Sequence, residues 1–106
     1  MNDTEPNYEL TDVELFENDS NCVGMYSFYD KKSKRYDTPF FCQSDMFAGR
    51  HYKMITGKEG TMLNTFKKDF NVVRLGFYNM KTGVYNECYD MIINGKNEVK
   101  KDQEEN

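Results

Sequence analysis

The stretch of sequence that decides the fold is CVGMYSFYDKKSKRYDTPFF, residues 22–41. Its first part alternates with a period of two, which predicts a β-strand over residues 22–30. One face of this strand would carry Val23, Met25 and Tyr29, and the other Tyr26 and Phe28. Because both faces are apolar, we expect the strand to lie at the centre of a sheet.

The polar run DKKSK, residues 30–34, predicts a turn, and residues 35–41 return as a second strand, so that the two strands form a β-hairpin. Pro39 has no N–H to donate, which places it at a sheet edge or at a strand end.

A helix is predicted after this hairpin. Ser44 can cap it, Asp45 lies in its first turn, and Gly57 ends it. Apolar side chains at helical spacing would form its buried face, namely Phe47, Ala48, His51, Met54 and Ile55. A short helical turn after Gly60 and Thr61 would direct three more inward, Met62, Leu63 and Phe66.

A second hairpin follows, with strands over 72–79 and 84–89 and a turn at 80–83. In the first of these strands, regular alternation places Arg74, Gly76 and Tyr78 on one face, opposite Val73, Leu75 and Phe77. The order ββαββ predicts an α+β domain in which one main helix packs on one face of an antiparallel four-stranded sheet. The other face would be partly bare, which suggests a dimer or a ligand surface.

Charge divides the 106-residue chain, whose net charge is -4. Residues 1–20 carry seven acids and no base, residues 21–70 have a net charge of +4, and residues 71–106 of -1. Blocks of like charge seldom fold, so we predict a disordered acidic arm over residues 1–20, a domain over 21–94 and a disordered charged tail over 95–106.

Several kinds of chemistry find no support in the sequence. The spacing of the sequence gives the single histidine, His51, neither a cysteine or serine nucleophile nor an orienting carboxylate. We interpret His51 as a residue at the boundary of the helix's buried face. A zinc site would need Cys22, Cys42 and Cys88 to converge on His51, so we interpret the cysteines as reduced thiols. We therefore expect no enzymatic activity, no metal and no cofactor. No apolar run is long enough to span a membrane, and no targeting signal is evident.

Basic side chains and tyrosines together fit a surface for single-stranded nucleic acid, where a positive groove follows phosphates and bases stack on rings. The candidate phosphate contacts are Lys31, Lys32, Lys34, Arg35, Arg50 and Lys53. The candidate stacking groups are Arg74, Tyr78 and Tyr85, with Tyr89 on the same strand face as Tyr85. The alternative for each set is structural, because lysine-rich turns are commonly only solvated and tyrosines pack well in strands.

Several short motifs, in order, resemble a known family. They are YSFYDKKS (26–33), RYDTPFF (35–41), AGR (48–50), KDF (68–70), LGFY (75–78) and KTG (81–83). Over residues 24–88 they are similar to the small nonstructural protein of gokushovirus-type microviruses, which are bacteriophages with single-stranded DNA. The resemblance implies a non-capsid accessory protein that assists viral DNA synthesis or packaging by binding DNA in the cytoplasm of the infected bacterium. The long acidic arm departs from that pattern.

Two functions remain open. The first is binding of single-stranded DNA. The second is a protein-interaction module whose bare sheet face pairs with itself, with a viral capsid or replication protein, or with a host factor, and whose tyrosines are interface anchors. Salt would separate them, because phosphate binding weakens steeply as salt rises.

Overall fold

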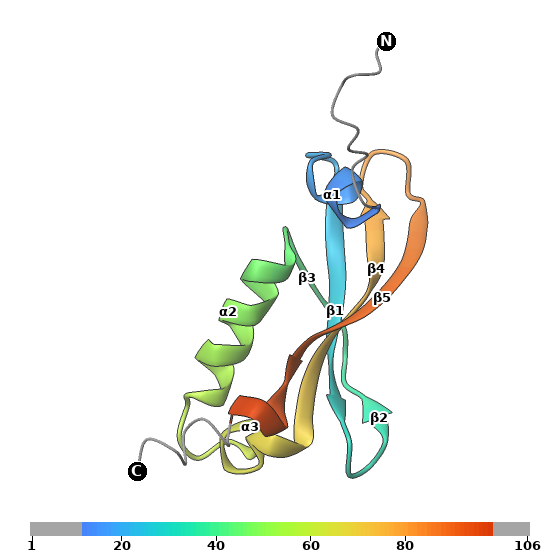
Figure 1. Cartoon of the computed structure of the whole chain (residues 1–106). Helices are drawn as coiled ribbons and strands as arrows, with labels where there is room; N and C mark the ends of the chain where they lie inside the picture. The colour runs from blue at the N-terminus through green and yellow to red at the C-terminus, as the bar shows by residue number, and fades with distance from the viewer. Residues whose placement is uncertain (1–11, 99–106) are drawn as a thin grey trace, which may run out of the picture.

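The computed structural model describes residues 12–98. The helical elements are α1 (Asp12–Glu17), α2 (Asp45–Thr56), α3 (Met62–Thr65) and the 3₁₀ turn η1 (Lys67–Asp69). The strands are β1 (Cys22–Asp30), β2 (Arg35–Tyr36), β3 (Phe40–Cys42), β4 (Phe70–Asn79) and β5 (Tyr85–Asn94). The predicted α+β domain is confirmed, with an antiparallel sheet and α2 as its main helix (Figure 1).

The sheet has the order β2-β1-β4-β5, and β3 also pairs with β1. The central position predicted for β1 is thus confirmed, but the sheet has five strands rather than four. The predicted second strand, 35–41, is divided into β2 and β3. Register pairing with β1 ends at Tyr36 and resumes at Phe40, directly after Pro39, which has no N–H for a ladder hydrogen bond.

The last strand continues past the predicted end at Tyr89 to Asn94, and a helical turn follows over residues 95–98. Gly95 is buried, its N–H donates to Asn71 Oδ1 at 3.2 Å, and a Cβ there would lie 2.2 Å from the carbonyl oxygens of Lys67 and Phe70. The prediction that the tail begins at Gly95 is therefore wrong for residues 95–98. Its remainder, 99–106, lies outside the described residues.

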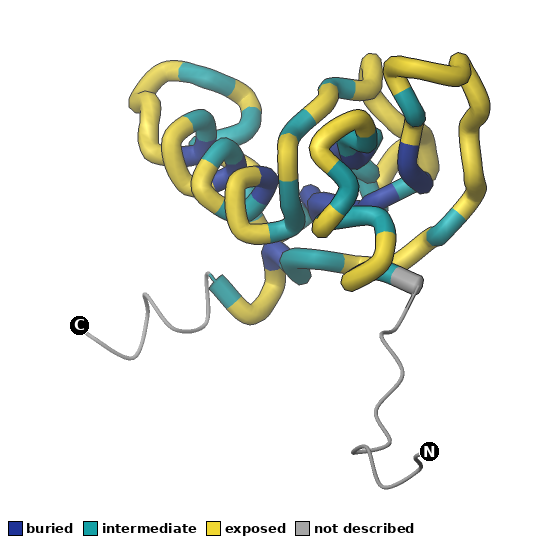
Figure 2. The backbone as a smooth tube through the Cα atoms, turned by 90° about the horizontal axis from the view of Figure 1, so that it is seen from above, coloured by how far each residue is buried: buried dark blue, intermediate teal, exposed yellow. Residues whose placement is uncertain are grey.

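The core lies between α2 and one face of the sheet (Figure 2). It consists of Tyr26, Phe28, Phe70 and Val72 from the strands and Ala48 and Tyr52 from α2. Ala48, Tyr52 and Thr56, four residues apart, form the buried stripe of the helix. Ile55 and Leu63 pack against this core as predicted.

Several apolar residues predicted in the core are exposed, and those predictions were wrong. The exposed fractions are 42% for Phe47, 59% for Met54, 65% for Met62 and 50% for Phe66. The buried stripe of α2 is centred on Tyr52, and Phe47 and Met54 lie at its outer margin. The predicted buried face did not include Tyr52. His51 does lie at the boundary, with its ring 4.5 Å from that of Phe40.

Part of the predicted disordered arm is folded. The phenyl ring of Phe16 in α1 stacks on that of Phe77 at 4.7 Å, and Glu17 Oε2 accepts a hydrogen bond from the N–H of Asp45 at 3.0 Å. Ser44 is the N-cap of α2, as predicted, but its side chain makes no capping bond. Glu17 supplies an acceptor there instead, so α1 fastens the start of α2 to the sheet. Residues 1–11 of the predicted arm lie outside the described residues.

An irregularity at Leu75 changes which side chains share a face of β4. Met25 and Tyr26 are adjacent in β1, yet they pair with Gly76 and Arg74, which are two residues apart. One extra residue in a strand is a β-bulge, and it reverses the alternation beyond it. Arg74 consequently turns to the side of α2, together with Val72 and Phe77.

Candidate nucleic-acid interface

The face of the sheet turned away from α2 is rich in tyrosine. Tyr26 and Arg74 contact Asp45 at the start of α2, so the positions that alternate with them point to the opposite side. We call this side the open face and define it by its aromatic residues, Tyr29, Tyr36, Phe41, Tyr78, Tyr85 and Tyr89. All except Tyr29 are exposed, up to 55% for Phe41 and Tyr89.

One aromatic cluster lies where β1 meets β2. Tyr29 and Tyr36 are register partners whose rings are 4.7 Å apart, and Tyr89 from β5 has a side-chain hydrogen bond with Tyr36. Ser27 and Val73 occupy neighbouring positions on this face and are buried even though no helix of residues 12–98 covers them. Partial removal from water, followed by the Tyr36 hydrogen bond, raises the pKa of Tyr89.

A second aromatic cluster lies nearer the β4–β5 turn. Tyr78 and Tyr85 are register partners, and the ring of Phe41 lies 6.2 Å from that of Tyr78. A Cβ on Gly76 would lie 2.5 Å from the hydroxyl oxygen of Tyr85, so the absence of a side chain there lets the Tyr85 ring lie against the sheet. Partial burial, followed by the charge of Glu87, raises the pKa of Tyr85.

The basic hairpin, which we define as residues 31–35, adjoins the first cluster because Tyr29 and Tyr36 lie immediately beside it in the register. Its turn is organised by Asp30, whose Oδ1 accepts from the N–H groups of Lys32 at 2.9 Å and Ser33 at 3.4 Å. Desolvation raises the pKa of Asp30, but these hydrogen bonds outweigh it and leave a lowered pKa. Lys32, Lys34 and Arg35 are exposed, and Lys34 has a positive φ of 60°.

Lys31 is less free than the other basic residues of the hairpin. It is partly buried, and its Nζ donates to Asn94 Oδ1 at 3.2 Å, which ties the hairpin to the end of β5. The carbonyl of Asp30 also accepts from the N–H of Lys34 at 2.7 Å. The hairpin is therefore held in one position relative to the first aromatic cluster.

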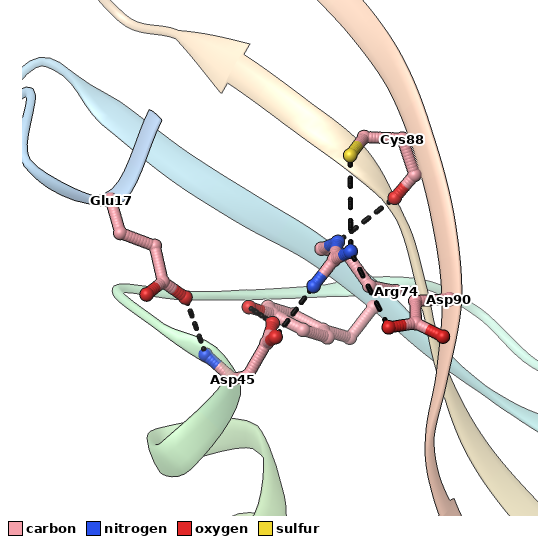
Figure 3. A network of polar contacts seen from close by, with 6 residues as sticks. Glu17, Asp45, Arg74, Cys88 and Asp90 are labelled. Carbon is pink, nitrogen blue, oxygen red and sulfur yellow. Dashed lines mark hydrogen bonds and ion pairs between the residues drawn. The ribbon is translucent and has the colours of Figure 1, made fainter. Parts of the chain in front are cut away.

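Arg74 does not join the tyrosines, so the predicted platform of Arg74 with Tyr78 and Tyr85 is wrong in this residue. The guanidinium is 2% exposed and forms an ion pair with Asp45, while its Nε donates to the carbonyl of Cys88 at 2.8 Å (Figure 3). The Tyr26 hydroxyl donates to the same carboxylate at 2.8 Å. A second carboxylate, that of Asp90, lies 3.9 Å from the Arg74 guanidinium. Desolvation lowers the pKa of Arg74, but the hydrogen bond and the charge of Asp45 outweigh this effect, so the pKa is raised overall. The guanidinium remains charged.

Arg50 and Lys53 are also separated from the hairpin. Both are exposed on α2, the helix that covers the other face of the sheet, and the guanidinium of Arg50 lies 5.8 Å from the ring centroid of Phe47. The predicted basic residues thus form two groups. Lys31, Lys32 and Lys34 adjoin the open face, whereas Arg35 alternates with Tyr36 and is directed to the covered face.

Sequence reasoning did not include Tyr29, Tyr36 and Phe41 among the site residues. Tyr29 was assigned to one face of the first strand, but its pairing with Tyr36 depends on the hairpin register. The turn DKKSK supplied the signal for that register, because a short turn fixes which residues lie opposite one another.

Other kinds of site are not evident in residues 12–98. Within this range no group of three or more His, Cys, Asp or Glu side chains could hold a metal ion. Cys22, Cys42 and Cys88 are free thiols, and burial raises the pKa of Cys42. No helix in the described range is long and apolar enough to cross a membrane.

Fold and site together define a class, a small α+β domain that presents an aromatic sheet face beside a basic hairpin. Residues 23–98 match the family model described as Phage ORF5 protein. Since this match covers well over half of the 106 residues, the chain belongs to the phage ORF5 protein family. No curated protein and no solved structure matches it.

Proposed function

We propose that this phage ORF5-family protein is a non-enzymatic accessory protein that binds single-stranded DNA across the open face. The observation that carries the proposal is the exposed tyrosines on one uncovered sheet face, with the basic hairpin at their edge. Aromatic rings offer a stacking surface for unpaired bases of any sequence, worth roughly 1–3 kcal/mol per base. The neighbouring cations supply the contacts to phosphate.

The basic hairpin at the edge of the open face suits an anionic ligand in spite of the net charge of -4 and of the exposed Glu87 on the face itself. The pKa values of Tyr85 and Tyr89 are raised, so both hydroxyls remain neutral near pH 7 and do not repel phosphates. Lys32 and Lys34 extend from an exposed turn at the edge of the open face. A local positive field of this kind attracts phosphate independently of the overall charge.

Single strands fit this surface better than duplexes because the bases of a duplex are stacked on each other and cannot reach the rings. Within a phage-infected bacterium, the product or template of viral DNA synthesis provides such strands. We extend the proposal to microviruses, to the host cytoplasm, and to assistance in viral DNA synthesis or packaging, on the strength of the motif resemblance over residues 24–88.

The test is fluorescence anisotropy of a labelled single-stranded oligonucleotide, with a duplex control, over a series of salt concentrations. We expect preferential single-strand binding that weakens as salt rises. The double variant Lys32→Ala/Lys34→Ala removes two exposed charges from the basic hairpin. It should reduce the slope of log affinity against log salt by about 1.4, because each phosphate contact on a single strand contributes about 0.7.

The matched control is Arg50→Ala/Lys53→Ala, which removes the same charge from α2 and should leave the slope nearly unchanged. Equal effects of the two double variants would show that binding follows total charge and would contradict the assigned surface. Absence of single-strand binding at low salt would overturn the proposal. It would also redirect attention to the protein-interaction alternative, in which the same tyrosines contact another protein.

A further inference from the structure

We propose that β5 pairs antiparallel with β5 of a second copy of this chain, about a two-fold axis at Cys88. In the sheet, β5 has β4 on one side and, within residues 12–98, no strand on the other (Figure 1). Its segment Tyr85–Met91 is exposed at every position except the partly buried Cys88. An unpaired strand edge offers backbone N–H and C=O groups to another strand.

The segment lacks two of the features by which proteins protect an edge, although a β-bulge against β4 lies between Glu87 and Asp90. Its sequence, YNECYDM, contains no lysine and no proline. The opposite edge of the sheet is different, since β2 and β3 are two and three residues long and are separated by residues 37–39, which include Pro39. Because β5 is ten residues long, its edge is the one suited to strand pairing.

The sequence of this segment is complementary to itself when the axis passes through Cys88. In that register Asn86 lies opposite Asp90 of the partner subunit, so that an amide meets a carboxylate. Glu87 lies opposite Tyr89 of the partner subunit, which places the carboxylate against a neutral side chain rather than another acid. Tyr85 lies opposite Met91 of the partner subunit, an apolar pair. Two-fold symmetry repeats each pairing.

Other registers are less favourable. An axis at Glu87 or at Asp90 would place two identical carboxylates directly opposite each other, which destabilises a strand pair. An axis at Tyr89 would place Asp90 opposite the Cys88 thiol, which is only a weak donor, and Glu87 opposite the apolar Met91. These comparisons favour Cys88, and they favour a second copy over an unrelated peptide, because the complementarity lies within one sequence.

This pairing joins the two sheets with their open faces on the same side, because residues that pair directly across an antiparallel ladder point to the same face. Tyr85 and Tyr89 of the two copies would then form one continuous aromatic surface, and both copies of α2 would lie on the other side. The inference does not depend on DNA binding, since it rests on the edge of β5 alone. Its failure and the failure of the DNA proposal are separate results.

The first test is sedimentation equilibrium of the full chain over a range of concentrations. We expect a mass approaching twice the 12.6 kDa of one chain. Asn86→Asp introduces two like-charge pairs with Asp90 of the partner subunit and should weaken dimerisation roughly tenfold, whereas Asn86→Lys should tighten it by a similar factor. Asn86 is exposed, so both variants should fold. A monomer at all concentrations, or a dimer that responds equally to both variants, would overturn the proposal.

A second test uses the thiol at the axis. Directly opposed residues have Cα atoms about 4.5–5.5 Å apart, a separation that a disulfide can span. In the double variant Cys22→Ser/Cys42→Ser, diamide should oxidise the Cys88 thiols of two copies to an intermolecular disulfide. Diamide takes up the two protons and two electrons that the thiols lose. The matched control Cys22→Ser/Cys88→Ser retains Cys42 on the β3 edge and should stay largely monomeric on a non-reducing gel. Faster crosslinking through Cys42 would refute the β5 interface.

Discussion

The two faces of the sheet use similar side chains for different purposes. On the face covered by α2, Tyr26 is fully buried and its hydroxyl donates to Asp45, which in turn pairs with Arg74. On the open face, Tyr89 is 55% exposed and its hydroxyl meets another tyrosine. A strand tyrosine is thus part of the core when a helix and a charged partner lie above it, and it is accessible to a ligand when they do not. Substitutions on the two faces should accordingly affect different measurements.

The largest effect is expected on the covered face, from Arg74→Met. Removing the guanidinium leaves the Asp45 carboxylate without its cation and the Cys88 carbonyl without its donor. Loss of one member of a buried ion pair costs about 3–5 kcal/mol of unfolding free energy, measurable by urea denaturation. The same substitution at exposed Arg50 is the control and should change stability by less than about 0.5 kcal/mol. Similar losses at the two positions would contradict the proposed importance of the buried network.

A smaller loss of stability is expected from Phe16→Ala, which removes the ring stacked on Phe77 and loosens α1. Because Phe16 is only partly buried, we expect a loss of about 2 kcal/mol, below the range for a fully buried phenylalanine. Leu15→Ala, in the same helix but 54% exposed, is the matched control and should have little effect. Hydrogen exchange should show faster opening of the first turn of α2 in Phe16→Ala only.

On the open face, Tyr89→Ala should separate binding from stability. We expect single-stranded DNA affinity to fall about tenfold, as loss of one stacking ring does, while the free energy of unfolding changes by less than about 1 kcal/mol. Anisotropy and urea denaturation of the same preparation would measure both. If stability fell sharply and affinity per folded molecule did not, the tyrosine would belong to the structural class seen on the covered face.

The smallest effect concerns the contact between Tyr36 and Tyr89. Burial is the main reason that the pKa of Tyr89 is raised, so Tyr36→Phe should lower it only part of the way toward the ordinary value. The raised pKa stabilises the fold below about pH 10, and this contribution is lost as pH rises through the higher value of the folded state. NMR titration of Cζ-labelled tyrosine would follow it. Tyr78→Phe, in the other cluster, should leave the Tyr89 titration unchanged.

Much of the covered face could be predicted from the sequence. The alternation in residues 22–30 placed Tyr26 and Phe28 together, and both are core residues. The bulge at Leu75 could not be predicted, since Val73, Leu75 and Phe77 follow an unbroken period of two, and the position of Arg74 was lost with it. Helix α1 was also missed. It lies in an acidic block and is held by contacts with residues far along the chain, Asp45 and Phe77.

The open face was predicted in part. Its bareness followed from having one main helix for a whole sheet, and Tyr78 and Tyr85 are indeed register partners. The grouping of Tyr29, Tyr36 and Tyr89 depends on pairing across four strands, which a linear pattern does not specify. Arg50 and Lys53 share a charge segment with the basic hairpin but not a face, because segment charge carries no information about the direction of a side chain.

The backbone of Lys34 gives the basic hairpin an evolutionary interest. Its φ of 60° lies in the left-handed region, which glycine adopts without steric cost but in which a lysine raises the free energy of the folded state. Lys34→Gly would relieve this strain and remove a cation at once, so any gain in thermal resistance would come with weaker attraction for phosphate. At this position a sequence selected for stability and one selected for activity would diverge, which makes residue 34 a place to measure the trade-off between them.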